Sequence, residues 1–191
     1  MTKVRTVAVL VGSLRKASYN RSMAKALASL GGPDLRLEIV EIGALPLYNE
    51  DVDTEEPPAA WTAFRQAIAA ADAVLFITPE YNRSVPGVLK NAIDVGSRPY
   101  GHSAWNGKPG AVISVSPGAI GGFGANHHLR QSLVFLNVSA MPQPEAYIGG
   151  AAHLFDEKGD IANDGTQAFL GGFIKAFAAW IEALAPAGSA S

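Results

Sequence analysis

The chain has 191 residues, of which 48% are hydrophobic and 17% charged, and its net charge is −2. This length fits one domain with a substantial core. The sequence has no run of basic residues, so nucleic acid is not expected as a partner. Because there is no cysteine, disulfides, thiolate metal sites and a cysteine nucleophile are excluded. The apolar run that ends at Gly12 is too short for a membrane span and lacks a signal-peptide cleavage pattern, so a cytoplasmic protein is expected.

Strand and helix patterns alternate along the chain. Apolar β-branched runs predict buried strands, and apolar residues at helical spacing predict amphipathic helices. In chain order the predicted elements are strand 6–11, helix 21–30, strand 35–42, helix 59–71, strand 73–78, helix 87–95, strand 109–116, helix 126–136, strand 139–148, a small hairpin within 153–165 and helix 169–184. The strand at 35–42 alternates apolar and charged residues, which favours a place near the sheet edge. Pro142 and Pro144 interrupt the last strand, which also favours an edge.

This alternation predicts an α/β fold, a doubly wound five-stranded parallel sheet with helices on both faces. A single domain over residues 1–185 accounts for every element, and the tail 186–191 is expected to be disordered. In such sheets, ligands bind beyond the carboxyl ends of the strands, at a topological switch point. Three loops, at 12–20, 79–85 and 116–124, follow predicted strands, so we expect them to meet at that edge and to form one ligand site.

The first loop, GSLRKASYN (12–20), lies between a buried strand and a helix N-terminus. Backbone N–H groups lack partners at such a terminus, and the helix dipole favours an anion there. Ser13, Ser18 and Asn20 add neutral donors, and Arg15 adds a guanidinium that suits phosphate oxygens. The loop has neither G-x-G-x-x-G nor a Walker ending, so a monophosphate fits better than a pyrophosphate or a triphosphate. The alternative is an ordinary capped helix start with solvated charges.

The second loop, PEYNRSVPG (79–87), is stiffened by two prolines and carries Tyr81 near its centre. Rigid backbone beside an aromatic ring offers N–H and C=O groups at fixed positions, as the pyrimidine edge of a flavin requires. The third loop, SPGAIGG (116–122), is rich in glycine, which lets backbone approach a planar ligand closely. The alternatives are a rigid turn whose Tyr81 only packs, and a mobile surface loop.

Four segments together strongly resemble the NADPH-dependent FMN reductase family, from about Thr6 to the C-terminal helix. These segments are GSLRKASYN, TPEYNRSVPGVLKNAID, SVSPGAIGG and HHLRQSLVFL. The resemblance implies a flavodoxin-like fold and an FMN-dependent NAD(P)H oxidoreductase, with NADPH or NADH as co-substrate. It also implies quinones as the acceptor class, with chromate, ferric chelates and azo dyes as further acceptors.

The resemblance also implies which residues contact FMN. The residues that would hold its phosphate and ribityl chain are Ser13, Arg15, Ser18, Tyr19 and Asn20. Those that would line the isoalloxazine ring or close its opposite edge are Pro79, Glu80, Tyr81, Asn82, Ser116 and Gly118. No side chain is assigned a catalytic role, because the cofactor carries the reaction. Backbone donors at Tyr81 and Asn82 are candidates for tuning the flavin.

Neighbouring histidines at 127 and 128 point in different directions on a helix and lack a third ligand, so no metal site is expected. Reductases of the flavodoxin-like class commonly complete the cleft with a second subunit, so a homodimer is expected. Residues 123–127 lack the arginine and tyrosine that join subunits in several relatives, which leaves a tetramer open.

Two other classes of function remain. One is an electron carrier like flavodoxin, without NAD(P)H turnover of its own. Such carriers are typically strongly acidic, so the net charge of −2 argues against this class. The other is a module that binds a different phosphate compound without redox chemistry.

Overall fold

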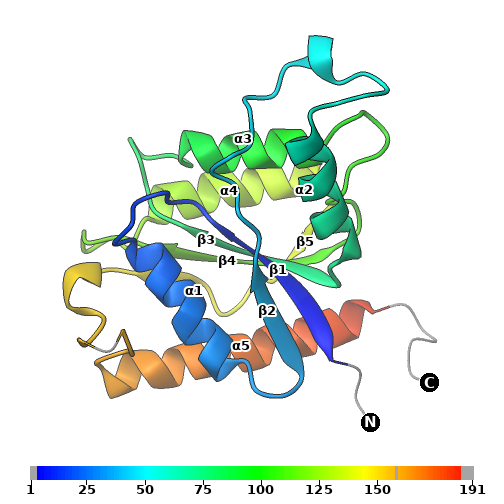
Figure 1. Ribbon diagram of the computed structural model, residues 1–191. Helices are drawn as coiled ribbons and strands as arrows, with labels where there is room; N and C mark the ends of the chain where they lie inside the picture. The colour runs from blue at the N-terminus through cyan, green and yellow to red at the C-terminus, as the bar shows by residue number, and fades with distance from the viewer. Residues whose placement is uncertain (1–3, 158, 186–191) are drawn as a thin grey trace.

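The computed structural model describes residues 4–157 and 159–185 and has three layers, with a parallel sheet between two layers of helices (Figure 1). The strands are β1 (Arg5–Val11), β2 (Leu35–Ile39), β3 (Ala73–Thr78), β4 (Pro109–Val115), β5 (Ser139–Ala140) and β6 (Ala146–Ile148). The helices are α1 (Tyr19–Leu30), α2 (Ala59–Ala70), α3 (Gly87–Gly96), α4 (Phe123–Phe135) and α5 (Asp164–Leu184), with short 3₁₀ helices η1 (Glu50–Val52) and η2 (Ala151–His153). Within the described residues, no helix is long and apolar enough to cross a membrane. The predicted tail 186–191 lies outside those residues.

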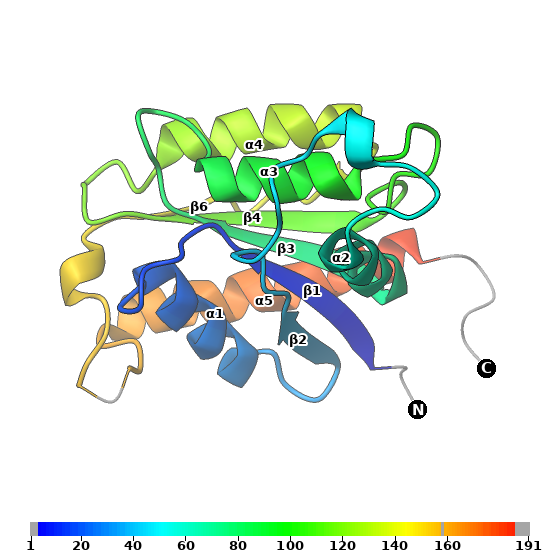
Figure 2. The same ribbon diagram turned by 45° about the horizontal axis from the view of Figure 1, so that its top comes forward.

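The strand order is β2-β1-β3-β4-β5, with β6 also paired to β4, and all pairs are parallel. This is the flavodoxin-like order, in which the direction of winding reverses between β1 and β3. The predicted fold class is therefore confirmed, and the strand at 35–42 lies at the sheet edge as expected. Helices α1 and α5 cover one face of the sheet, and α2, α3 and α4 cover the other (Figure 2).

Each central strand is apolar on both sides because each side faces a helix layer. On one side, Val9 and Ile77 pack with Phe173 of α5. On the other side, Leu10 and Phe76 pack in the cluster that contains Trp61, Trp105 and the buried residues of α3 and α4. A strand buried on both faces shows a continuous apolar run rather than an alternation, and the sequence has such runs at β1, β3 and β4.

The last predicted strand is split into β5 and β6, so the sheet has six strands rather than five. Ser139 and Ala140 pair with the start of β4, and Ala146–Ile148 pair with its end, at Ile113–Val115. Both pieces therefore occupy one edge position. Pro142 and Pro144 lie between them, and proline cannot donate a ladder hydrogen bond, which explains the interruption.

Helices α1, α4 and α5 begin earlier than predicted, and in α1 and α5 the first turns carry polar residues, which apolar periodicity does not detect. Ser18 caps α1, with its Oγ accepting from the N–H of Arg21, and Asn163 caps α5, with its Oδ1 accepting from the N–H of Thr166. Pro86 is the cap residue that precedes α3. The predicted hairpin in 153–165 is shorter than expected. It is closed by a bridge between Phe155 and Ile161, since α5 already begins at Asp164.

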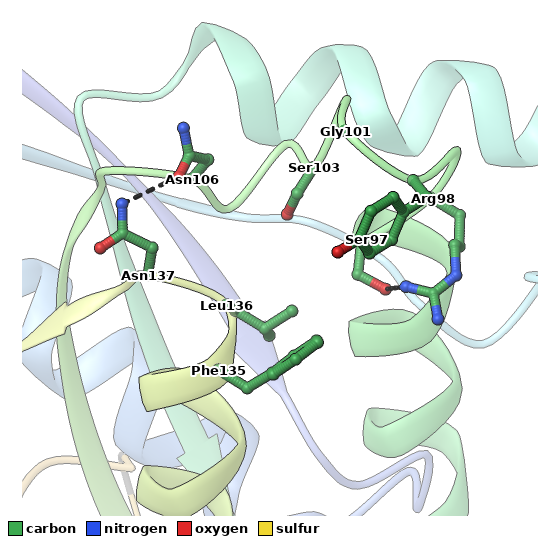
Figure 3. A pocket seen from close by; sticks show the side chains of 9 residues that line it. Ser97, Arg98, Gly101, Ser103, Asn106, Phe135, Leu136 and Asn137 are labelled. Atoms are coloured by element: carbon green, nitrogen blue, oxygen red, sulfur yellow. Dashed lines mark hydrogen bonds between the residues drawn. The ribbon is translucent and has the colours of Figure 1, made fainter.

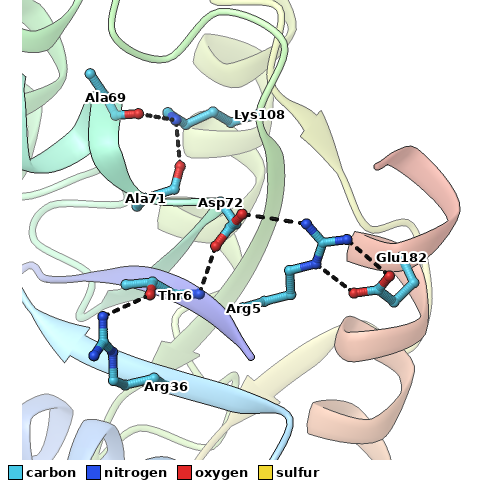
Figure 4. A network of polar contacts seen from close by, with 8 residues as sticks. All are labelled: Arg5, Thr6, Arg36, Ala69, Ala71, Asp72, Lys108 and Glu182. Carbon is cyan, nitrogen blue, oxygen red and sulfur yellow. Dashed lines mark hydrogen bonds and ion pairs between the residues drawn. The ribbon is translucent and has the colours of Figure 1, made fainter. Parts of the chain in front are cut away.

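A polar network closes the amino ends of the strands, opposite the three loops (Figure 4). Arg5 donates to Glu182 of α5 over 2.7 Å and to Asp72 over 3.4 Å, and Asp72 also accepts from the N–H of Thr6. Lys108 donates to the carbonyl of Ala71 over 2.6 Å at the end of α2, and burial lowers the pKa of its ammonium. This network joins both helix layers to the sheet at the end away from the expected ligand site.

Candidate functional site

The three predicted loops meet at the carboxyl edge of the sheet and enclose a cavity of about 210 Å³. Its lining residues are Ser13, Arg15, Ser18, Tyr19, Asn20, Pro79, Glu80, Tyr81, Val115, Ser116 and Pro117. All residues predicted for the site line this cavity except Asn82 and Gly118. The cavity lies where β1 leads to α1 on one face and β3 leads to α3 on the other, which is the topological switch point at which such sheets bind ligands.

Close packing of the first two loops depends on Gly12, at the end of β1. A Cβ placed there would lie 3.1 Å from Cδ2 of Leu89 and 3.2 Å from Cδ of Pro79. These separations are tighter than most contacts of real side chains. Glycine therefore lets the loop after β1 and the loop after β3 lie against each other.

The first loop retains the features of an anion site. Across the described part of the chain, the backbone amides of residues 13–20 have no protein acceptor. The N-terminus of α1 adds its dipole, and such arrays bind phosphate. Arg15 is exposed, with its guanidinium 5.8 Å from the ring centroid of Tyr19. Ser18 accepts from Arg21, which leaves its hydroxyl hydrogen available to a ligand.

Asn20 has a different environment from the one expected for a pure phosphate donor. Its Nδ2 donates to the carbonyl of Val115 over 3.3 Å, and this bond fixes the amide orientation. Its Oδ1 is buried and has no hydrogen-bond partner among the described residues, and Asn20 is only 4% exposed. A buried acceptor in this state costs about 1–3 kcal/mol and requires a donor. A phosphate dianion supplies none, but a ribityl hydroxyl does, so this residue fits a phosphorylated polyol such as FMN better than a simple phosphate.

The second loop forms a tight turn. The N–H of Tyr81 donates to the carbonyl of Ser84 over 3.1 Å, and the reverse bond is 3.0 Å long. Asn82 and Arg83 have φ angles of 51° and 65°, as in a two-residue type I′ turn. The turn itself uses the N–H of Tyr81, so a role for that N–H as a donor to the flavin stays a prediction. The N–H of Asn82 has no acceptor in the described protein and remains the turn's candidate donor.

Glu80 lines the cavity and also holds the turn against α4. Its Oε2 accepts from the N–H of Ala125 over 3.1 Å, and its Oε1 lies 3.5 Å from Nη1 of Arg83. A Cβ at Gly124 would lie 2.9 Å from both the carbonyl oxygen of Arg83 and Oε2 of Glu80. The first turn of α4 therefore packs directly on the second loop. No local sequence pattern predicted this contact, although the glycine at 124 was a usable signal.

The third loop is fixed by β6. Ser116 donates its N–H to the carbonyl of Ile148 over 2.9 Å, and its Oγ accepts from the N–H of Gly118. Gly121 has a φ of 65°, and a Cβ there would lie 2.5 Å from the carbonyl carbon of Tyr147. Glycine is thus required here by contact with the protein's own backbone.

A buried polar cluster, which the sequence patterns did not predict, supports this edge. Asn126 is fully buried, and its Nδ2 donates to Oγ of Ser114 and to the carbonyl of Ala146, both over 3.3 Å. Arg130 donates to Oδ1 of Asn126 over 2.9 Å and to the carbonyl of Met141 over 3.0 Å. These bonds join α4 to the segment between β5 and β6.

The two histidines of α4 have separate partners. Nε2 of His127 lies 2.9 Å from the hydroxyl of Tyr147, and Nδ1 of His128 lies 3.0 Å from Oγ of Ser84. Burial, together with Glu145, raises the pKa of Tyr147 to about 12, so that phenol is protonated at neutral pH. Across residues 4–157 and 159–185, no three His, Asp or Glu side chains are grouped to hold a metal ion.

Two of the larger cavities, of about 310 and 280 Å³, lie together at the C-terminal ends of α3 and α4. Figure 3 shows the first, with Phe135 and Leu136 on one side and Ser97 and Arg98 on the other. The C-terminal ends of helices carry partial negative charge. These cavities therefore lack the arrangement that favours phosphate at the first loop.

Comparison with known proteins gives consistent matches over almost the whole chain. The family model for NADPH-dependent FMN reductase matches residues 5–153. A "Quinone reductase" of Pseudomonas putida is 66% identical, over 95% of this chain and 97% of its own length. A "2-hydroxy-1,4-benzoquinone reductase" of a Burkholderia species is 50% identical, over 92% and 95%. The solved structure of FerB, a flavoenzyme NAD(P)H:(acceptor) oxidoreductase of Paracoccus denitrificans, matches with a TM-score of 0.89 and 46% identity, over 94% and 98%. The chain belongs to the NADPH-dependent FMN reductase family.

Proposed function

We propose that this protein is an FMN-dependent NAD(P)H:quinone oxidoreductase whose cofactor lies in the cavity between the loops after β1, β3 and β4. The observation that carries the site is the run of backbone amides at 13–20, next to the buried Oδ1 of Asn20, all without a hydrogen-bond partner in the part of the chain that the structure describes. Quinones as the acceptor class are supported by the relatives from Pseudomonas and Burkholderia, which are named as quinone reductases. FMN, when bound, supplies two-electron exchange with NAD(P)H and with a quinone.

The protein's own groups bind and orient the cofactor in this proposal. The amides of 13–20, the hydroxyls of Ser13 and Ser18 and the guanidinium of Arg15 hold the phosphate, with Tyr19 beside them. Oδ1 of Asn20 accepts a hydrogen bond from a hydroxyl of the ribityl chain. The residues that border the ring are Pro79, Glu80, Tyr81, Asn82, Ser116 and Gly118. A rigid turn at 81–84 lets the N–H of Asn82 keep one direction through turnover.

We expect Arg15→Ala to weaken FMN binding with little effect on folding, because Arg15 is exposed and lines the cavity. One charge-assisted contact contributes about 1.5–3 kcal/mol, so the dissociation constant should rise roughly tenfold or more. Flavin fluorescence titration of the apoprotein measures this. Lys16→Ala is the matched control, since it removes the same charge next to the cavity and should change the affinity much less. Equal FMN affinity in Arg15→Ala and the parent would disprove the phosphate assignment.

Steady-state kinetics test the activity itself. The three loops form one cavity at this edge, so NAD(P)H and the quinone should occupy the same space in turn. Initial rates against NAD(P)H at several quinone concentrations should therefore give parallel lines in a double-reciprocal plot. Intersecting lines, with a ternary complex seen by rapid mixing, would indicate two separate substrate pockets. Absence of NAD(P)H consumption with every quinone would favour the electron-carrier alternative. The same assay tests chromate, ferric chelates and azo dyes as further electron acceptors.

A homodimer, in the cytoplasm, is part of the proposal. The cavity of about 210 Å³ is smaller than the roughly 300–1,000 Å³ of typical ligand pockets, as expected for a site that a second subunit completes. On the face formed by α3 and α4, Val134 and Phe135 are 79% and 76% exposed. Light scattering after size exclusion should give a dimer, and Phe135→Glu should shift it to a monomer. A monomeric parent protein would contradict the proposal.

A further inference from the structure

The flavin turn, residues 81–84, is held by one helix from both of its ends. At its beginning, Glu80 accepts from the N–H of Ala125. At its end, Oγ of Ser84 is bonded to Nδ1 of His128 over 3.0 Å. Ala125 and His128 lie one helical turn apart, so consecutive turns of α4 hold the two ends.

The turn needs such external support. Asn82 and Arg83 both have positive φ. Asparagine adopts this backbone more readily than most residues, but for Arg83 it costs about 1–2 kcal/mol. The preferred sequences for this turn place glycine at the second position, where this chain has Arg83. Strained backbone of this kind persists only where the surrounding structure enforces it.

We propose that His128 is a positioning residue for the redox reaction, acting through Ser84 to fix the direction of the free N–H of Asn82. This inference rests on the proposed placement of FMN, with the flavin ring reaching past Tyr81, which lines the cavity, to Asn82, which does not. The hydrogen bond is exposed, so it contributes little to global stability. The hydrogen bond instead fixes the conformation of the turn that the flavin would contact. A backbone donor kept in one direction stabilises the negative charge of reduced FMN, and a turn released from His128 would do so less well.

The test is the midpoint potential of bound FMN in four single variants. His128→Ala and Ser84→Ala should lower the potential by the same amount, and the double variant should lower it no further. A tenfold loss of preference for reduced over oxidised FMN corresponds to about 30 mV. His128→Asn should restore most of the potential, because its Oδ1 can take the place of Nδ1. His127→Ala is the matched control and should leave the potential unchanged, since that ring contacts Tyr147.

The outcomes separate this inference from the proposed function. If the parent protein binds no FMN, the proposed function fails. If the parent binds FMN and both His128→Ala and Ser84→Ala keep its potential, only the role of His128 is overturned. The role of His128 is also overturned if the potential falls in His128→Ala but not in Ser84→Ala. It is likewise overturned if the potential falls in His128→Ala but stays equally low in His128→Asn. Thermal melting of each variant shows whether any shift reflects loss of folding.

Discussion

Gly121→Ala is expected to destabilise the protein and to displace the third loop from the cavity. The residue has a φ of 65°, and its Cβ would lie 2.5 Å from the carbonyl carbon and 2.7 Å from the carbonyl oxygen of Tyr147. The left-handed backbone costs about 1–2 kcal/mol and the overpacking about 1–3 kcal/mol, so the free energy of unfolding should fall by about 2–5 kcal/mol. Because the atoms in contact are backbone atoms of β6, no side chain can rotate to relieve the clash.

Denaturant unfolding measures the loss of stability, and FMN titration of the folded fraction measures the effect of the displaced loop on cofactor binding. Gly150→Ala is the matched control, because Gly150 has a φ of 61° but no atoms within 4 Å of its Cβ position. That variant should lose only the backbone contribution of about 1–2 kcal/mol. Equal losses in the two variants would show that contact with Tyr147 is unimportant.

Arg65→Met should cost about 3–5 kcal/mol of stability, because it leaves a buried carboxylate without its partner. The side chains of Arg65 and Asp53 are 14% and 3% exposed, and two hydrogen bonds of 2.9 and 2.8 Å join them. Nε of Arg65 also donates to the carbonyl of Val95. The pair therefore connects the segment before α2 to the end of α3.

The comparison for this prediction is Arg36→Met, which removes an exposed pair with Glu38. Exposed pairs contribute about 0–1 kcal/mol, so this variant should unfold almost like the parent. In the double variant Arg65→Met/Asp53→Leu, most of the loss should be recovered, since no unpaired charge remains buried. A single variant Arg65→Met as stable as Arg36→Met would contradict the assignment.

The sequence predicted the sheet and the meeting of the three loops at one edge, because both follow from the pattern of strands along the chain. The run AVLFIT matches β3 residue for residue, since a strand buried on both faces must be apolar throughout. The meeting of the three loops follows from topology, because the carboxyl ends of parallel strands share one edge. The resemblance to the family then placed the candidate residues in these loops.

What the sequence could not predict depends on contacts between distant residues. The bond from Ala125 to Glu80 joins residues 45 apart, and the bond from Asn20 to Val115 joins residues 95 apart. No local pattern encodes either. The turn at 81–84 lacks the glycine that usually marks its type, so the use of the Tyr81 N–H within it was also hidden. The polar Asn126 on the buried side of α4 was a detectable signal.

Anaerobic titration of the FMN-loaded protein is the most direct test of the central claim, that one flavin at this edge takes electrons from NAD(P)H and passes them to a quinone. One equivalent of NAD(P)H, without any acceptor, should bleach the flavin absorbance completely. One equivalent of quinone added afterwards should restore it. A flavin that stays oxidised with NAD(P)H alone, in a protein that binds FMN normally, would contradict the account and indicate an electron carrier instead.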